Sequence, residues 1–517
     1  MKHNIIYLCL LAFGLTLTGC GEGFLEVEPQ ASDDINTYYT TDTHLQEAVV
    51  ASYDPLHWFD FDGSYAPLNL CSDVMSDDIY PGGASASDML NWQLMFNFSA
   101  TSDQTLSSLW TDVYSGVKRC NDAVGYITKA LDNGYDPDNF NQEKANEYLA
   151  QVRVLRDYYY LILWKFWGNI PYYTENLKPE NGYKSKQFTA DEVYNSVITD
   201  LEEVLSTYGS YLPMKASSSN AGHVTKAFAY MIYAELVMYQ NDENRYQTAL
   251  GYMNDIINSG DYALDASFAD IWKETGEWSS ESIFEINYDD NNHQRGWSYT
   301  KGVGGTVLPR LTGPRGWTSG VGGLDTGWGF GPVRKEAYDM YAEGDTRRDV
   351  SIYDADALAA ANSITYEKSY MNTGYFQGKY RPLPENNKDA GWDVDLNFNN
   401  NFRIYRYAET LLNAAELTLR TNGSNATATR YVNQVRERAG IEDLSSVTID
   451  DIINERHLEF LGEGKRYWDL VRTGKAATTL VPDAEGFRTK AWTDNKKYLP
   501  LPQGEISADP NLKQNNY

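Results

Sequence analysis

The sequence lacks most of the motifs on which large enzymes depend. It has only four cysteines and six histidines among 517 residues, and these form neither an H-E-x-x-H nor a His/C-x-x-C pattern, so no zinc site is predicted. A G-x-x-x-x-G-K-[ST] loop, a G-x-S-x-G elbow and a G-x-G-x-x-G fingerprint are also missing. Basic residues are few, 43 against 72 acidic ones, which argues against binding to nucleic acid or to an anionic membrane surface. A glycosidase stays open, because its two carboxyl groups need only meet in space.

Aromatic residues, by contrast, are abundant. The chain has 13 Trp, 40 Tyr and 18 Phe residues, and 42% of all residues are hydrophobic. It can therefore bury a core, and its 22% of charged residues disfavours both wholesale disorder and a coiled coil. So many rings indicate a large aromatic core or surfaces that stack on ligands.

The amino terminus has the features of a bacterial lipoprotein signal. A basic start at Lys2 precedes an apolar stretch over residues 5–17 that ends in Leu17-Thr18-Gly19-Cys20. We therefore expect residues 1–19 to be removed, Cys20 to carry the lipid and residues 20–30 to form a tether. An ordinary signal peptide with an incidental cysteine is the alternative. No later apolar stretch is long enough to span a bilayer.

Two cysteines remain once the leader and the lipidated residue are set aside. They are Cys71 and Cys120, and residue numbers alone do not show whether they lie close enough to pair. Two free cysteines in the core are the favoured interpretation, with a disulfide as the alternative.

Hydrophobic residues at three-to-four spacing predict a mainly α-helical chain. The spacing begins near Thr43, and helices are expected over residues 106–130, 143–167, 189–208, 224–239, 246–258, 403–421, 426–439 and 448–460. Gly168 should end the second of these, with Pro171 beyond it. Neighbouring helices with short polar loops are typical of antiparallel hairpins, as in tetratricopeptide repeats, although the period is irregular. Residues 31–517 are therefore predicted to form one domain, a scaffold of tetratricopeptide-like hairpins with large irregular loops and a few short strands.

Strand-like alternation is rare, and residues 282–288 show it best. Residues 293–331 hold 12 of the 40 glycines together with Trp297, Trp317 and Trp328. This density opposes regular structure and predicts a long ordered loop, and such loops often carry function. A second insertion, over residues 362–401, is polar and rich in Asn, Tyr and Asp.

A charged block over residues 454–472 could be mistaken for an active site. Glu455 and Glu459 lie one helical turn apart, and Arg456 and Arg466 are near in sequence. Mixed acids and arginines at a helix end commonly form an ionic lattice that holds a loop in place, and this interpretation is favoured over a catalytic one.

Nine short motifs follow one another along the mature chain. They are Phe24-Leu25-x-Val27-x-Pro29, Trp110-x-x-Val113-Tyr114-x-x-Val117 with Cys120-Asn121, the Arg153 helix ending in Gly168-Asn169-Ile170-Pro171-Tyr172, His223-Val224-Thr225-Lys226-Ala227, Glu281-x-Ile283-Phe284-Glu285-Ile286, Gly327-Trp328-Gly329-Phe330 with Asp345-x-Arg347-Arg348, Arg406-Tyr407-Ala408-Glu409 with Ala415-Glu416, the block Asn454-Glu455-Arg456 to Arg472, and Tyr498-Leu499-Pro500-Leu501-Pro502-x-x-Glu505-Ile506. Together they resemble the SusD/RagB family of outer-membrane lipoproteins. Residues 153–156 depart slightly from the family's usual Leu-Arg-Ala.

The resemblance implies a glycan-binding lipoprotein anchored at Cys20 on the outside of the outer membrane. It implies a SusC-like TonB-dependent transporter as partner, over whose barrel the lipoprotein sits as a hinged lid. Members of the family bind oligosaccharides or polysaccharides without cleaving them and pass them to the barrel. No catalytic residue and no cofactor are therefore predicted. Calcium is conceivable at Asp73, Asp77 and Asp78 or within residues 349–356, but the sequence alone does not support predicting it.

The resemblance also suggests which rings contact the glycan. In the family, the platform draws on a loop before the first long helix and on loops after the central strand, where this chain has Tyr80, Trp92, Trp297 and Trp317. An aromatic ring can cover the apolar face of a sugar while polar groups at its rim bond the hydroxyls. Core positions are predicted for Trp110, Trp164, Trp167 and Trp468, and a structural role for Trp328.

Two alternatives to glycan capture remain. One is a lid that captures peptides, although no strand edge for pairing with a peptide is recognisable. The other is a surface glycoside hydrolase, which would need two carboxylates at a fixed separation beside the rings. The net charge of −29 favours a neutral polysaccharide slightly over a polyanionic one.

Overall fold

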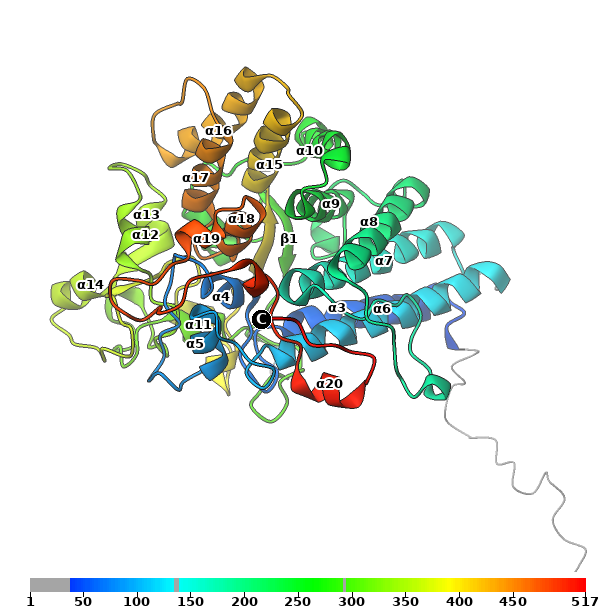
Figure 1. The fold of residues 1–517 in the computed structure, drawn as a ribbon, viewed down its shortest axis with the longest axis horizontal. Coiled ribbons are helices and arrows are strands. Elements are labelled where there is room, and N and C mark those ends of the chain that lie inside the picture. Colours follow the sequence, from blue (N-terminus) through cyan, green and yellow to red (C-terminus); the bar gives the residue numbers. More distant parts are fainter. Residues whose placement is uncertain (1–37, 134–138, 292–293) are drawn as a thin grey trace, which may run out of the picture.

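A computed structural model describes residues 38–133, 139–291 and 294–517, so the predicted signal peptide, lipidation site and tether lie outside it. Within these ranges the chain is mainly α-helical (Figure 1). The helices are α3 (Asp42–Tyr53), α4 (Leu68–Asp73), α5 (Leu90–Phe96), α6 (Ser107–Asn133), α7 (Gln142–Trp167), α8 (Ala190–Thr207), α9 (Lys226–Gln240), α10 (Tyr246–Ser259), α11 (Leu308–Thr312), α12 (Lys335–Asp339), α13 (Arg348–Ser351), α14 (Ala355–Ala361), α15 (Tyr407–Arg420), α16 (Asn425–Ala439), α17 (Ile449–Phe460), α18 (Arg466–Arg472), α19 (Ala476–Thr479) and α20 (Gln503–Ala508). The predicted fold class is confirmed.

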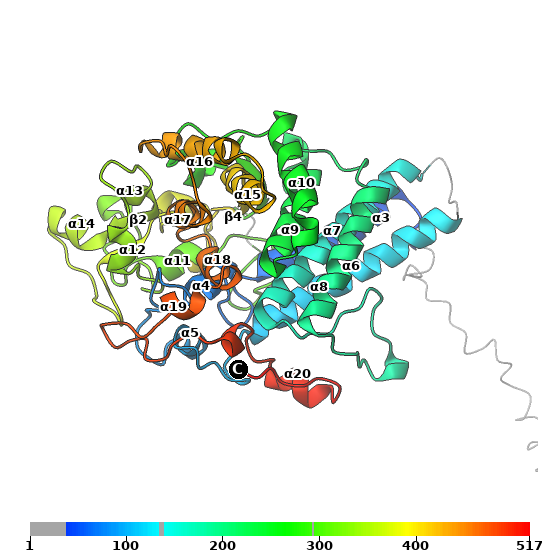
Figure 2. The same ribbon diagram turned by 45° about the horizontal axis from the view of Figure 1, so that its top comes forward.

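The long helices form a continuous stack. Each packs on the next, from α6 through α7, α8, α9 and α10 to α15, and α15 packs on α16 and α17 (Figure 2). Helix α3 lies against both α6 and α7. This arrangement is the predicted scaffold of tetratricopeptide-like hairpins. No helix among the described residues is long and apolar enough to cross a membrane.

Local signals set the helix ends. The side chain of Asn141 accepts the Lys144 N–H at the start of α7, and Gly168, at a φ of +66°, ends that helix as predicted. Between the ends, Gly116 in α6 lets the ring of Tyr159 in α7 pack against the helix backbone, where a methyl group would collide with the ring. The close pairing of α6 and α7 therefore depends on a glycine.

The strands form two small antiparallel pairs. Strand β1 (Ser282–Ile286) confirms the sequence prediction and pairs with β4 (Phe402–Arg406), while β2 (Ile352–Asp354) pairs with β3 (Tyr375–Gln377). The prediction of a helix from residue 403 is wrong for its first four residues, which belong to β4. Arg403 and Arg406 interrupt the apolar pattern in sequence, but both are buried here.

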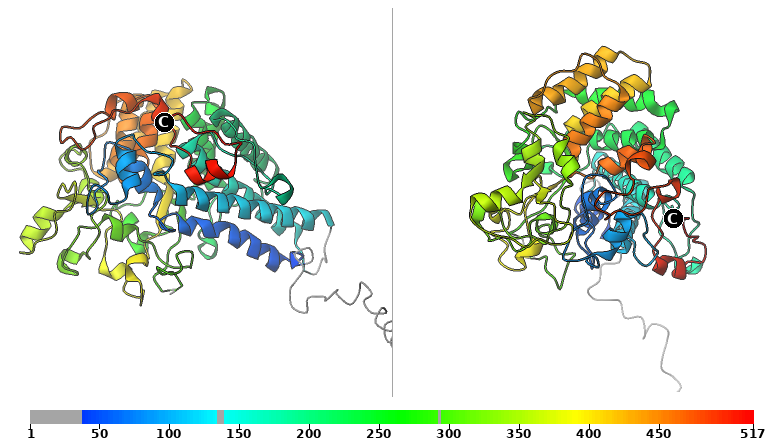
Figure 3. Two further views of the ribbon diagram at one scale, coloured as in Figure 1. Left: turned by 60° about the horizontal axis from the view of Figure 1, so that its bottom comes forward. Right: turned by 60° about the vertical axis from the view of Figure 1, so that its left-hand side comes forward.

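Loops and short elements gather at one end of the molecule. In Figure 1, α11 to α14 lie at the left, away from the long helices α6 to α8, and Figure 3 shows the same division from two other sides. The predicted loop over residues 293–331 is irregular except for α11 and one 3₁₀ turn, and α4 and α5 lie beside it. Trp110, Trp164, Trp167 and Trp468 are buried in the core, as predicted. Cys71 and Cys120 are buried and free, which confirms the favoured interpretation.

Candidate functional site

Only one of the four rings predicted to contact a glycan lies on the surface. Trp297 is 45% exposed, whereas Trp92 is 0%, Tyr80 3% and Trp317 3% exposed. A ring without an open face has no surface on which a sugar can stack. The structure therefore corrects the prediction for Tyr80, Trp92 and Trp317, and contact between Trp297 and a glycan stays a prediction.

The three buried rings each have an identifiable partner, and Tyr80 packs edge-to-face on Phe96, with ring centroids 5.6 Å apart. Trp92 packs edge-to-face on Phe330, with ring centroids 5.4 Å apart. The indole N–H of Trp317 donates to the Val321 carbonyl at 2.9 Å, because the glycine-rich backbone folds back over the ring. Loop position in the sequence predicted exposure for these residues, but tertiary folding placed the rings inside.

Trp297 and four other partly or largely exposed rings lie together, and we call this group of five the aromatic platform. Its members are Tyr65, Trp297, Tyr299, Trp328 and Trp392. Tyr299 is 61% and Trp392 47% exposed. Trp297 lies 6.1 Å from Trp328, which lies 5.5 Å from Tyr65, measured between ring centroids. Since these rings come from three separate loops, only the fold assembles them.

Direct contacts join the two loops that carry the most exposed rings. Gly296 and Tyr299 close a tight turn through two backbone hydrogen bonds, and Trp297 lies within it. The Trp297 backbone N–H donates to Asp393 Oδ2 at 3.1 Å. A side chain at Gly296 would meet the Trp392 ring at 3.0 Å, so a glycine at this position lets the two loops approach closely.

Buried polar groups support the platform from beneath. The Arg295 guanidinium pairs with the Asp60 carboxylate at 2.7 Å. Asp60 also accepts the Thr306 hydroxyl at 2.8 Å. Asn397 accepts the Gly305 N–H at 3.0 Å. Because these bonds tie the loop over residues 295–306 both to Asp60 and to Asn397, the network holds the rings on that loop in fixed positions.

Carboxylates lie at the rim of the platform. Burial, with the nearby carboxylates of Asp88 and Asp395, raises the pKa of Tyr65 to about 12. Asp395 is itself paired with Arg310, at 2.8 Å. Charged and amide groups around exposed rings are what a neutral polyhydroxyl ligand requires for hydrogen bonding.

A second charged cluster ties the platform loop to helix α6. Lys301 lies 3.0 Å from Asp62 and 3.4 Å from Asp112 in α6. Its ammonium group lies 4.4 Å from the centre of the Trp58 ring. Burial and the charge of Asp62 raise the pKa of Asp112 to about 8.

The charged block over residues 454–472 is an ionic lattice, as the favoured interpretation holds. Arg347 pairs with Glu455 at 2.6 Å and with Glu459 at 3.2 Å, and all three side chains are buried. Arg456 pairs with Asp469 at 2.8 Å. Because their charged groups are fully used inside the protein, these residues offer nothing to a substrate.

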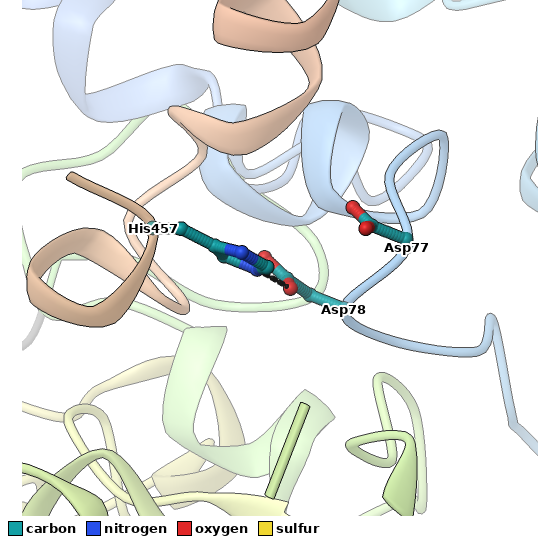
Figure 4. Close-up of side chains that lie close together, drawn as sticks. All are labelled: Asp77, Asp78 and His457. Carbon is teal, nitrogen blue, oxygen red and sulfur yellow. Dashed lines mark hydrogen bonds and ion pairs between the residues drawn. The ribbon is translucent and has the colours of Figure 1, made fainter. Parts of the chain in front are cut away.

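One group of three potential metal ligands occurs within the described ranges, formed by Asp77, Asp78 and His457 (Figure 4). His457 in α17 bonds Asp78 at 2.5 Å. Although burial opposes it, two hydrogen bonds from Arg466 lower the pKa of Asp77. An arginine therefore already occupies both Asp77 oxygens, and this donor set fits calcium poorly. We interpret the group as a structural contact that fixes the segment with Asp77 and Asp78 to α17.

The sequence interpretation missed most of the platform. Tyr65 and Tyr299 carry no local signal, and Trp328 was predicted to be structural only. Trp392 stands alone in the polar stretch over residues 362–401. An isolated tryptophan among polar residues was the one signal that could have indicated it.

Comparison with known proteins identifies the family of this chain. One family model, described as "Starch-binding associating with outer membrane", matches residues 23–237. Another, described as "SusD family", matches residues 214–517. The chain belongs to the SusD family.

Several relatives cover nearly its whole length. The surface glycan-binding protein A from Bacteroides thetaiotaomicron, solved in complex with laminarihexaose, is 50% identical with a TM-score of 0.86 over 92% of this chain and 100% of that one. A structure described as a laminarin binding SusD-like protein is 28% identical with a TM-score of 0.81 over 92% and 100% of the two chains. The SusD-like protein P25 from Formosa agariphila is 25% identical over 99% of this chain and 98% of its own.

Proposed function

We propose that this SusD-family protein captures a β-glucan of the laminarin type on the aromatic platform and does not cleave it. The observation that carries the proposal is the set of exposed rings at Trp297, Tyr299 and Trp392 on a loop-rich face. The 50% identical relative that was solved with laminarihexaose supports this choice of ligand.

The platform suits such a ligand physically. Each glucose ring has an apolar face of C–H groups that an indole or phenol ring covers, while its hydroxyls bond polar groups at the rim. The platform rings are tilted rather than coplanar, with 32° between Trp297 and Trp328 and 51° between Trp328 and Tyr65. Tilted rings favour a curved glucan over a flat, extended one.

Within the same proposal, the mature chain is anchored to the outer membrane through a lipid on Cys20 and acts as a hinged lid on a SusC-like TonB-dependent transporter. The outer-membrane association in the description of the matched family supports this location. Co-purification of the full-length chain with a transporter subunit from detergent-solubilised membranes, lost when Cys20 is replaced by alanine, would support both parts.

The ligand is tested with the purified mature chain lacking Cys20. Native gels containing laminarin, starch, xylan or mannan should show retardation by laminarin alone, with no loss of polymer length. Trp297→Ala and Trp392→Ala should each weaken the retardation strongly, and Tyr211→Ala, which removes an exposed ring elsewhere, should not. Release of short sugars would instead indicate a hydrolase. Retardation by no glycan, together with binding to peptides, would indicate a peptide-capturing lid.

A further inference from the structure

A cleft that is separate from the aromatic platform lies along the carboxyl-terminal half of α6. It has a volume of about 800 Å³ and runs between α6 and residues 174–179. Volumes of this order are typical of ligand sites. The two walls are joined by side chains, since the Asn176 amide donates to the Asp122 carboxylate at 2.5 Å. This contact fixes residues 174–179 against α6, so the two walls of the cleft are connected.

An aromatic pair and mixed polar groups line this cleft. The rings of Tyr39 and Tyr126 stack at 3.9 Å with 9° between their planes, and both remain partly exposed. Thr128, Glu175 and Lys178 add exposed donors and acceptors along the walls. Such a lining suits a neutral polyhydroxyl ligand, because the rings can cover the apolar face of a sugar, the polar groups can bond its hydroxyls, and an anion would meet several carboxylates.

A glycine in the helical wall leaves the helix backbone open to the cleft. Gly125 lies inside α6, exposed and facing the cleft, and a Cβ atom there would have no neighbour within 4 Å. A glycine inside a helix lowers helix stability relative to alanine. No packing within the protein requires Gly125, so the backbone at this position is accessible to a ligand in the cleft.

We propose that this cleft, lined by Tyr126 and Gly125, is a second saccharide-binding site. It shares no residue with the aromatic platform and so goes beyond the proposed function. Asp112, which contacts the platform loop through Lys301, and Tyr126 both lie on α6. The rise of a helix places them about 21 Å apart along its axis. A polymer held at both sites would dissociate more slowly than a short oligosaccharide held at one.

The test is calorimetric titration of the mature chain lacking Cys20 with laminarihexaose. We expect two classes of site. Gly125→Leu and Tyr126→Ala should each weaken one class at least about tenfold, and Trp297→Ala should weaken only the other. Gly251→Leu is the matched control, because Gly251 lies inside α10 and a Cβ there also has no neighbour within 4 Å. Both glycine substitutions should raise the thermal midpoint.

Each outcome decides the proposal. A single class of site in the wild-type chain overturns it, as does a second class that neither cleft substitution weakens. If no class of site is sensitive to Trp297→Ala while the class weakened by the cleft substitutions is present, the proposed function of the platform is refuted and the cleft site is supported. If laminarihexaose does not bind at all, both fail.

Discussion

Replacing Trp297 with alanine should cost much of the glycan affinity and little of the stability. Trp297 is 45% exposed, and with about 250 Å² for a whole tryptophan side chain roughly 110 Å² is open to a ligand. At about 25 cal/mol per Å², covering half to all of this area contributes about 1.4–2.8 kcal/mol to binding. The expected loss of affinity is therefore about ten- to a hundredfold. The ring also packs on Phe61 and Trp328, so the variant should lose about 1–2 kcal/mol of unfolding free energy.

The assay is calorimetric titration with laminarihexaose, beside unfolding in urea. Trp317→Ala is the contrasting variant, because its ring is buried and its indole N–H is bonded. It should lose about 3–5 kcal/mol of unfolding free energy while its folded fraction binds normally. The platform would be refuted if Trp297→Ala bound laminarihexaose as tightly as wild type, or if Trp317→Ala alone lost affinity without losing stability.

Three further predictions concern buried groups. Asp112→Asn should become more stable relative to wild type as pH rises from about 4 to about 8. The pKa of Asp112 is raised to about 8, so ionisation of this carboxyl costs the wild-type chain folding free energy across that range. A pH-independent difference in urea midpoints would contradict this. Arg347→Met should lose about 3–5 kcal/mol of unfolding free energy, since buried Asp345 would lose the guanidinium it pairs with and Glu455 and Glu459 would each lose one of their arginine partners. Unchanged stability would contradict the lattice. Cys71 and Cys120 should react with a thiol reagent only after unfolding in urea, because both are buried and burial raises both thiol pKa values, that of Cys120 to about 12. Fast reaction of the native chain lacking Cys20 would show instead that the two thiols are accessible.

Sequence periodicity predicted the helical scaffold well, because helix formation and burial of an apolar stripe are properties of neighbouring residues. The predicted helix over residues 143–167 is observed as Gln142–Trp167, and Gly168 ends it as expected. Periodicity failed at residues 403–406, where a strand replaces the expected helix. Pairing with β1 and ion pairs to Arg406 from distant glutamates decided that segment, and neither is visible within a local window.

By itself, the sequence determined the family, the mainly α-helical class and the core tryptophans, since order of motifs and local periodicity are encoded along the chain. Only the tertiary structure decided which rings face solvent. Trp297 and Trp317 lie in the same glycine-rich loop, yet one is exposed and the other is buried. The difference arises because contacts with Asp393 and Trp392, nearly 100 residues away, hold the Trp297 turn at the surface, while the loop folds back over Trp317. The aromatic platform is thus a product of three loops meeting in space, which no single stretch of sequence encodes.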